Sequence, residues 1–323
     1  MDINQIKKPI EADLEVFEKT FKEVSKSNVS LLDIITRYIV KSKGKQIRPM
    51  FVFLTAKMLG TSNESTQRAA ALIELLHTAT LVHDDVVDDS NRRRGYFSIN
   101  ALWKNKVAVL VGDFLLSKGM LLALENKDFD LLEIVSHATK QMSEGELLQI
   151  EKARRLDITE EIYFDVIKKK TASLIASCCA AGAASVNSSA EEVQMMHDFG
   201  EHVGIAFQIR DDLFDFQFNN KSGKPVGGDI KEKKMTLPLI YMLNNMSYVE
   251  RKKMIMKIKY QSSNNKTVES IIEQVNASGG MQYAQQKMQY HLNKAISLLD
   301  NHDNNQYKEA LIGLVNYAIY RKK

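Results

Sequence analysis

Two short stretches of the chain repeat one spacing of aspartates. The first holds Asp84, Asp85 and Asp88, and the second holds Asp211, Asp212 and Asp215. Helical residues four apart lie on one face, so the first and last aspartates of each stretch would present two carboxylates side by side. A hard cation such as Mg²⁺, which binds carboxylate, water and phosphate oxygens, would relieve their repulsion. The spacing therefore predicts that a diphosphate is bound through several magnesium ions.

Basic residues follow both aspartate stretches. They are Arg92, Arg93 and Arg94 after the first, and Lys221, Lys224, Lys231, Lys233 and Lys234 after the second. Guanidinium and ammonium groups bind phosphate oxygens, and the planar fork of arginine suits them well. A solvated turn between helices would also explain one such cluster, but the repeat favours a metal–diphosphate site. Asp89 and Arg92 are assigned no catalytic role.

An apolar helical run precedes each aspartate stretch. These runs are residues 71–83, "ALIELLHTATLVH", and residues 199–209, "FGEHVGIAFQI". Both would line an apolar cavity beside the metal ions. The substrate that this arrangement predicts has an anionic head and an apolar tail.

The elements that must position these residues are helices. Only 4 prolines and 15 glycines occur among 323 residues, and helix-favouring residues dominate. Helical periodicity predicts helices within residues 14–40, 50–59, 69–81, 98–125, 129–153, 159–185, 189–216, 237–246, 283–299 and 307–323. No segment predicts a strand. A glycine-rich basic loop at 219–236 interrupts the pattern, and such long loops are usually functional or disordered. We predict an all-α protein with a single domain over residues 1–323.

Composition bounds the compartment and the partners. The net charge of +4, from 44 basic and 40 acidic residues, argues against nucleic-acid binding. Adjacent Cys178 and Cys179 suit the core of a protein in a reducing compartment, and residues 171–189 are too short and polar for a membrane span. We therefore predict a cytoplasmic protein. Residues 249–260 alternate basic with apolar residues, which favours a solvated amphipathic helix over one that lies on a membrane.

Seven motifs in order make the chain resemble the trans-isoprenyl diphosphate synthases of the polyprenyl synthetase family, in particular its medium- and long-chain members. The resemblance covers about residues 40 to 240. Its motifs are "GKQIRP" (44–49), "ELLHTATLVHDDVVDDSNRRRG" (74–95), "VGDFLLSKG" (111–119), "EGELLQ" (144–149), "KKT" (169–171), "FQIRDDLFD" (207–215) and "GKPVGGDIKEKKMTLP" (223–238).

The resemblance implies a fold and a reaction. The fold would be one large bundle of antiparallel helices around a deep central cavity, of the isoprenoid synthase type. The reaction would join isopentenyl diphosphate head-to-tail to an allylic diphosphate, which ionises, is attacked and then loses a proton. Magnesium ions would neutralise the departing diphosphate.

The resemblance also implies residue roles. The six aspartates, Asp84, Asp85, Asp88, Asp211, Asp212 and Asp215, would hold the magnesium ions that bridge to the allylic diphosphate. Other roles fall to Arg93, Lys170, Lys224 and Lys234 on the allylic diphosphate, and to Lys45, Arg48, His77 and Arg94 on isopentenyl diphosphate, which needs no metal. Lys170, Thr171 and Gln208 would be catalytic, placing oxygen dipoles near the developing cation.

Product length follows from the residues upstream of the first motif. Ala79 and Thr80, five and four residues before Asp84, are small. In the family, bulky residues there end elongation early, so we predict a medium- or long-chain all-trans product that serves as a quinone side-chain precursor. A short-chain (farnesyl or geranylgeranyl) synthase is the alternative.

Two further alternatives differ in class. A terpene cyclase would not need the isopentenyl diphosphate residues, and a non-catalytic subunit of a heteromeric synthase would be expected to lose acidic ligands. The resemblance also implies a homodimer. The apolar product predicts transient membrane contact during release.

Overall fold

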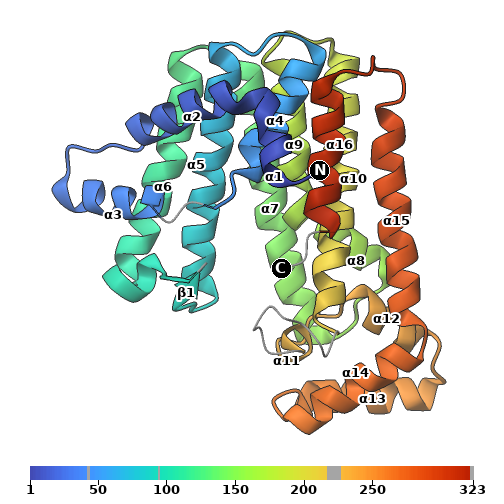
Figure 1. Ribbon diagram of the computed structural model, residues 1–323. Helices are drawn as coiled ribbons and strands as arrows, with labels where there is room; N and C mark the ends of the chain where they lie inside the picture. The colour runs from blue at the N-terminus through green and yellow to red at the C-terminus, as the bar shows by residue number, and fades with distance from the viewer. Residues whose placement is uncertain (42–43, 94, 217–226, 321–323) are drawn as a thin grey trace. The chain divides into compact units, whose positions relative to one another are not determined.

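The computed structural model describes residues 1–41, 44–93, 95–216 and 227–320, and these are almost entirely helical (Figure 1). Their contacts divide the chain into two compact units. Unit 1 holds residues 1–139, 174–198 and 301–317, and unit 2 holds residues 140–173, 199–300 and those from 318 onwards. Each unit is described by itself.

The elements of the described chain follow one another in this way. Unit 1 contains α1 (Ile3–Lys7), the 3₁₀ turn η1 (Lys8–Ile10), α2 (Glu11–Val24), α3 (Ser30–Lys41), α4 (Ile47–Leu59), α5 (Glu64–Val87), β1 (Arg92–Arg93), β2 (Tyr96–Phe97) and α6 (Ile99–Glu125). Unit 2 contains α8 (Glu160–Ile167), the π-helical turn η2 (Lys168–Ala172), α11 (Gly228–Lys231), α12 (Leu237–Asn244), α13 (Tyr248–Gln261), α14 (Asn265–Ala277) and α15 (Gly280–Leu298). Divided between the units are α7 (Phe129–Arg155), α9 (Ser173–Ala184), α10 (Ala190–Phe214) and α16 (Gln306–Tyr320).

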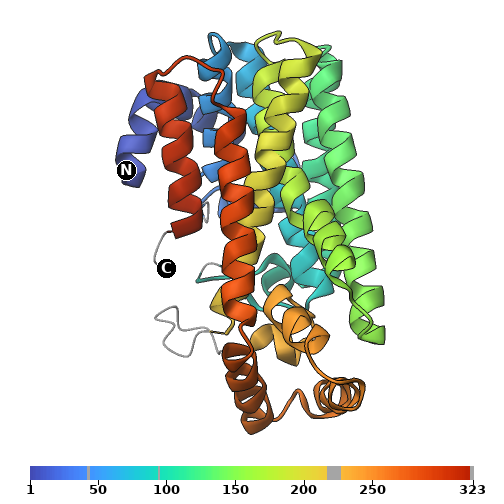
Figure 2. The same ribbon diagram turned by 90° about the vertical axis from the view of Figure 1, so that its right-hand side faces the viewer.

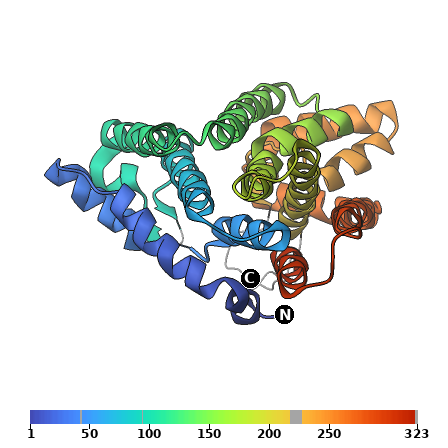
Figure 3. The same ribbon diagram turned by 90° about the horizontal axis from the view of Figure 1, so that it is seen from above.

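Helix α5 is the centre of unit 1. Its first turn is capped by Asn63, whose side chain accepts from the Thr66 backbone N–H while the Thr66 hydroxyl accepts from the Asn63 N–H. Beyond the cap, α5 buries side chains from Ala69 to Asp85 and packs against α2, α4 and α6, as Figure 3 shows from above. The last turn of α5, which carries the first aspartates, is therefore held by a packed helix.

In unit 2, two glycines allow close packing around η2. A Cβ at Gly145 of α7 would lie 2.7 Å from the Lys170 backbone nitrogen, and a Cβ at Gly204 of α10 would lie 2.4 Å from the Ala172 Cα. No side chain larger than hydrogen fits at either position. Single π turns inside helices often occur at functional sites, and this one carries Lys170 and Thr171.

The rest of unit 2 is built around α12. This helix is buried along most of its length and packs against α8, α14 and α15. Beyond it, α13 and α14 lie across the end of the long helix α15 (Figure 2).

The predicted all-α class is confirmed, with local differences. The predicted helix over 14–40 is interrupted between α2 and α3, where the Ser25 hydroxyl donates to the Phe21 carbonyl (2.7 Å) at the end of α2. The segment 159–185 is α8, η2 and α9 rather than one helix. The single-domain organisation stays a prediction.

One small hairpin was not predicted. Strands β1 and β2 pair antiparallel, Arg92 with Phe97 and Arg93 with Tyr96, next to Gly95 at φ +83°. Two residues per strand are too few to show an alternating pattern, so no strand could be predicted there. Their effect is local, because β1 fixes the position of Arg93.

Helix α6 has a large apolar surface that is exposed. Among the described helices it is the one long and apolar enough to cross a membrane by length and composition, with 33% of its most apolar window buried. Its inner face, which includes Val111, Leu115 and Ala123, is buried. Large apolar side chains on its outer face, 41% to 59% exposed, are Leu102, Val109, Leu110, Met120, Leu121 and Leu124.

The close packing of η2 makes Gly204→Ala destabilising. The added methyl group overlaps the Ala172 backbone, and we expect the free energy of unfolding to fall by about 1–3 kcal/mol in chemical denaturation. Gly60→Ala is the control, because a Cβ there meets only Val186 at 3.4 Å, an ordinary contact. Equal stability of Gly204→Ala and Gly60→Ala would show that η2 is not tightly enclosed.

Candidate active site

Both aspartate motifs lie at the C-terminal end of a helix. Asp84 and Asp85 are in the last turn of α5, and Asp88 is its C-cap. Carboxylates near the negative end of a helix dipole are unfavourable, by about 0.3–1 kcal/mol each. A bound cation would offset that cost. The motif is thus placed for cation binding at the expense of helix stability.

The second motif repeats this placement in unit 2. Asp211 and Asp212 belong to the last turn of α10, and Asp215 follows the helix. The Asp215 carboxylate accepts from the backbone N–H groups of Gly228 (2.9 Å) and Asp229 (3.0 Å). Asp215 therefore anchors the start of α11. Its predicted metal role stays a prediction.

In unit 1, Asp85 is paired with Arg93. The Asp85 side chain is buried, and its Oδ1 accepts from the Arg93 Nε at 2.7 Å. The Asp85 carbonyl accepts from Asn100 Nδ2 (3.1 Å). Asp85 and Arg93 also line a pocket with His77, whose walls include Tyr38. The arginine predicted to bind diphosphate thus balances the charge of a predicted metal ligand.

Residues predicted to bind isopentenyl diphosphate also fall in unit 1. The Lys45 Nζ donates to the Tyr317 hydroxyl (2.7 Å), while His77 is buried. Burial raises the pKa of the Cys178 thiol to about 12, against the opposing charge of Arg48 and with a contribution from Glu74. Arg48 and Glu74 therefore both lie near the buried Cys178 thiol. Glu74 lies one turn before His77 on α5. Arg94 lies outside the described residues.

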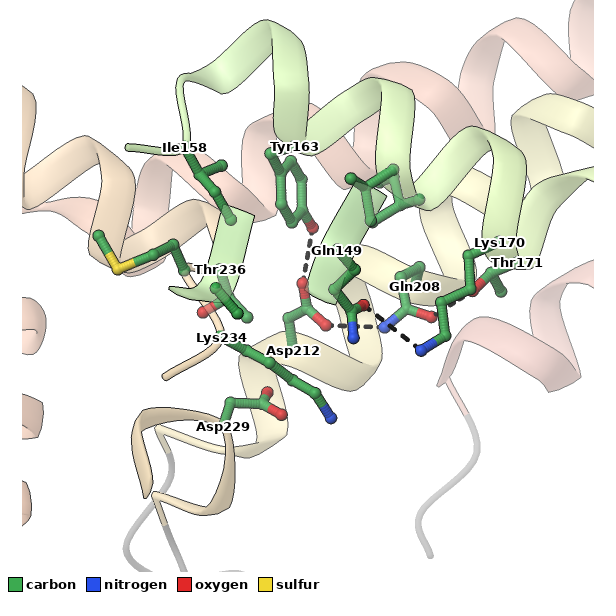
Figure 4. Close-up of a pocket in the computed structure, with 14 residues that line it drawn as sticks. Gln149, Ile158, Tyr163, Lys170, Thr171, Gln208, Asp212, Asp229, Lys234 and Thr236 are labelled. Carbon is green, nitrogen blue, oxygen red and sulfur yellow. Dashed lines mark hydrogen bonds between the residues drawn. The ribbon is translucent and has the colours of Figure 1, made fainter. Parts of the chain in front are cut away.

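A pocket of unit 2 brings together five predicted residues (Figure 4). They are Lys170, Thr171, Gln208, Asp212 and Lys234. Lys224, the third lysine predicted to bind the allylic diphosphate, lies outside the described residues.

A chain of hydrogen bonds crosses this pocket. The Thr171 hydroxyl donates to Gln208 Oε1 (2.8 Å), and Gln208 Nε2 donates to Asp212 Oδ1 (2.8 Å). On the far side of Asp212, the Tyr163 hydroxyl donates to Oδ2 (2.7 Å), as Figure 4 shows. These bonds fix the orientation of the Gln208 amide and hold both oxygens of Asp212.

The pocket shifts the titration of Asp212. Burial, and after it the nearby Asp229 carboxylate, raise its pKa to about 8, although hydrogen bonds from Tyr163 and Gln208 act to lower it. Burial and the charge of Asp212 likewise raise the pKa of Tyr163 well above its usual value. A divalent cation bound beside Asp212 would favour its ionised form.

The donor set fits Mg²⁺ rather than a metal held by protein alone. Within the part of the chain that the structure describes, no three His, Cys, Asp or Glu side chains converge on a common point. Magnesium commonly takes one or two carboxylates and completes its octahedron with water and substrate phosphate oxygens. The carboxylates at the end of α10 and on α11 provide hard oxygen donors of that kind.

Several residues of the unit 2 pocket were not predicted to act. The Lys170 ammonium forms an ion pair with Glu146 and lies 3.4 Å from Gln149 Oε1. Glu146 and Gln149 belong to the motif "EGELLQ", and Asp229 belongs to "GKPVGGDIKEKKMTLP". The motifs therefore included these residues, but no function was predicted for them. Tyr163 belongs to none of the motifs, and its contact with Asp212 could not be predicted because the two residues are 49 apart in sequence.

The residues predicted to set product length lie on α5. Ala79 is buried, and the Thr80 hydroxyl donates to the His77 carbonyl (2.9 Å). Neither is among the residues that line the two pockets described above. Their effect on chain length stays a prediction.

Comparisons with known proteins identify the family. A family model for polyprenyl synthetase matches residues 29–275. The octaprenyl diphosphate synthase of Escherichia coli (strain K12) is 35% identical over 324 residues, 100% of each chain. A solved polyprenyl synthase from Caulobacter crescentus CB15, complexed with calcium and isoprenyl diphosphate, matches with a TM-score of 0.90 at 30% identity, over 100% of this chain and 98% of that one. A geranylgeranyl pyrophosphate synthase from Bacteroides thetaiotaomicron matches with a TM-score of 0.84 at 37% identity, over 99% of each chain.

The chain therefore belongs to the polyprenyl synthetase family. The matches confirm the resemblance to trans-isoprenyl diphosphate synthases and the isoprenoid synthase fold.

The raised pKa of Asp212 predicts a pH-dependent stability. Between its ordinary value of 3.8 and about 8, the folded metal-free protein holds a proton that the unfolded chain releases. Stability due to this proton is present at low pH and is lost as the pH rises through about 8. Asp212→Asn should therefore be more stable than the wild type at pH 8 to 9 without metal, by about 1–3 kcal/mol.

Thermal denaturation across pH, with and without Mg²⁺, measures this difference. Added Mg²⁺ should stabilise the wild type more than Asp212→Asn. If the wild type and Asp212→Asn show the same pH dependence, Asp212 does not titrate in this window.

Proposed function

We propose that the chain is a Mg²⁺-dependent prenyltransferase that condenses isopentenyl diphosphate head-to-tail with an allylic diphosphate, giving an all-trans polyprenyl diphosphate. One observation carries the proposal most strongly. The unit 2 pocket places two lysines and an oriented hydroxyl–amide pair beside the buried carboxyl group of Asp212, whose pKa is raised to about 8. Those are the groups that an ionising diphosphate ester needs.

Different residues of the pocket stabilise the leaving diphosphate and the allylic cation. Lys170 and Lys234 attract the negative charge that develops on the leaving diphosphate. The Thr171 oxygen and Gln208 Oε1 direct partial negative charge toward the allylic cation. Bound magnesium, held by the aspartates of each motif, would supply further positive charge to diphosphate oxygens.

The pocket also restricts water. Its walls include Ile158, Val166 and Ile167, which are apolar and buried or nearly so. Water excluded by these side chains cannot quench the cation before isopentenyl diphosphate attacks.

The product proposed is a medium- or long-chain polyprenyl diphosphate, a precursor of a quinone side chain. The small residues Ala79 and Thr80 and the octaprenyl diphosphate synthase relative support this length. The geranylgeranyl pyrophosphate synthase relative keeps a short-chain product as the alternative. Buried His77 and the basic residues of unit 1 disfavour a terpene cyclase, which has no second diphosphate to bind.

We also propose a cytoplasmic homodimer that binds no nucleic acid. The exposed apolar side of α6 supports the dimer, because single folded chains rarely leave so many large apolar side chains on one helix exposed to water. Polar residues such as Asp113 and Ser117 on the same helix favour a protein neighbour over lipid.

A charge placed on this side of α6 should disrupt the dimer. We expect Leu110→Glu to convert the wild-type dimer to a monomer, because an unpaired carboxylate would be buried at the interface. Light scattering after gel filtration measures the mass. Val16→Glu on α2, at a side chain of similar exposure, should leave the mass unchanged. A monomeric wild type, or a dimer that survives Leu110→Glu, would contradict this surface.

An elongation assay tests the activity itself. The purified chain is incubated with farnesyl diphosphate, labelled isopentenyl diphosphate and Mg²⁺, and the dephosphorylated products are separated by length. We expect a ladder ending at one dominant product longer than geranylgeranyl. A cyclised hydrocarbon would indicate a cyclase, and no product at all would indicate a subunit that lacks its partner.

Two adjacent aspartates provide a matched pair for this assay. Asp88→Asn, in the motif, should lower kcat by about 100-fold or more, because a metal ligand is lost. Asp89→Asn removes the same charge at an exposed site with φ +48°, which asparagine tolerates, and should retain activity. Equal loss in both variants would mean that general charge, rather than the motif, matters.

A further inference from the structure

Helix α13 has apolar side chains on two opposite sides. Met254 and Ile258 are buried. Val249, Met256 and Tyr260 point the other way and are between 54% and 66% exposed. The inner pair accounts for packing of the helix, so the outer residues are not needed for folding.

Lysines alternate with these outer apolar residues. Val249, Lys252, Lys253, Met256 and Tyr260 stand at i, i+3, i+4, i+7 and i+11, the spacing of one helical face. All five are exposed, and a shallow hollow on this face is lined by Lys252, Lys253, Met256 and Tyr260. We call these five residues, together with exposed Tyr248 and Lys259, the outer face of α13.

The outer face carries more positive than negative charge from its own helix, because three lysines lie on it and Glu250, which interacts with Lys253, is the one acid of α13. The one acidic residue of α13 is Glu250, and its carboxylate accepts from the Ser247 N–H (3.1 Å) and hydroxyl (2.5 Å) at the helix start. The Lys252 and Lys259 ammonium groups lie over the rings of Tyr248 and Tyr260, at 4.5 and 5.6 Å. Lysines beside aromatic and aliphatic side chains form a surface that suits the boundary between lipid headgroups and acyl chains.

The helix is tied to the segment that carries pocket residues. The Ser262 hydroxyl, at the C-cap of α13, donates to the Lys231 carbonyl of α11 (3.5 Å). A Cβ at Gly227, just before α11, would lie 2.2 Å from Val268 of α14. Asp229 and Lys234 therefore lie on a segment held against the α13–α14 pair.

The sequence alone favoured a solvated helix over residues 249–260, but the exposure of an apolar and basic face changes that interpretation. We propose that the outer face of α13 docks unit 2 on an anionic phospholipid surface. The purpose of docking rests on the proposed function, because a long polyprenyl chain is insoluble in water. Docking would place the segment that carries Asp229 and Lys234 near the lipid that receives the product. A second copy of the chain is a poorer occupant, because symmetric pairing of this face would set lysines against lysines. Charge complementarity therefore selects lipid.

Vesicle binding by the full-length protein tests the proposal. Phosphatidylcholine vesicles, with and without phosphatidylglycerol, are sedimented with the protein in the absence of substrate. We expect binding that requires phosphatidylglycerol and weakens with salt. Lys252→Gln, Lys253→Gln and Lys259→Gln combined should weaken it roughly 100-fold, since each lysine near an anionic surface contributes about fivefold.

A matched control separates this face from net charge. Lys8→Gln, Lys19→Gln and Lys22→Gln remove the same three charges from exposed positions of η1 and α2, and should bind vesicles as the wild type does. A second variant, Met256→Gln with Tyr260→Gln, should also weaken binding, because the apolar part of the face is lost. Melting curves establish that each variant is folded.

Four results would overturn the proposal. They are no binding by the wild type, equal binding without phosphatidylglycerol, full binding by the α13 lysine variant, or an equal loss in the control. Elongation measured without vesicles in the same preparations keeps the two claims apart. Vesicle binding without elongation would count against synthase activity of this chain on its own but not against the docking surface. Elongation without vesicle binding would contradict the docking surface but not the activity.

Discussion

The structure depends on carboxylates placed where helices least favour them. The aspartates of both motifs lie at the C-terminal ends of α5 and α10, where the helix dipole is negative. In unit 2 the burial of Asp212 beside Asp229 adds to that cost. Positive charge from lysine, arginine or metal is the direct means of offsetting it, and the same charge stabilises a departing diphosphate.

The remaining features of unit 2 keep this unfavourable group in position. Tyr163 and Gln208 bond the two oxygens of Asp212 from opposite sides. Gly145 and Gly204 let α7 and α10 approach the π turn closely, which sets Thr171 at hydrogen-bond distance from Gln208. The tight packing in this region therefore serves the orientation of a few polar groups.

Much of the fold and part of the site could be predicted from the sequence. Helical periodicity and the scarcity of proline sufficed for the all-α class, and ordered motifs brought Lys170, Thr171 and Gln208 into one proposed site. Local geometry was harder to predict. The π turn gives no periodic signal, and a two-residue strand is too short for one.

Long-range contacts were the other limit. The bond of Tyr163 to Asp212 joins residues 49 apart in sequence, and no spacing rule indicates it. The backbone bonds to Asp215 likewise depend on the path of the chain before α11. Solvent exposure could not be predicted either. The sequence of α6 indicates an apolar helix, but it does not indicate that one face of the helix remains exposed.

The most direct test of the central claim compares diphosphate binding with and without metal. Titration calorimetry would measure the affinity of farnesyl thiolodiphosphate, which ionises slowly, and that of isopentenyl diphosphate. If the motif aspartates act through cations, Mg²⁺ should strengthen binding of the allylic analogue by about 100-fold or more and leave isopentenyl diphosphate nearly unchanged. Equal affinity for the allylic analogue with and without divalent cations would contradict the account.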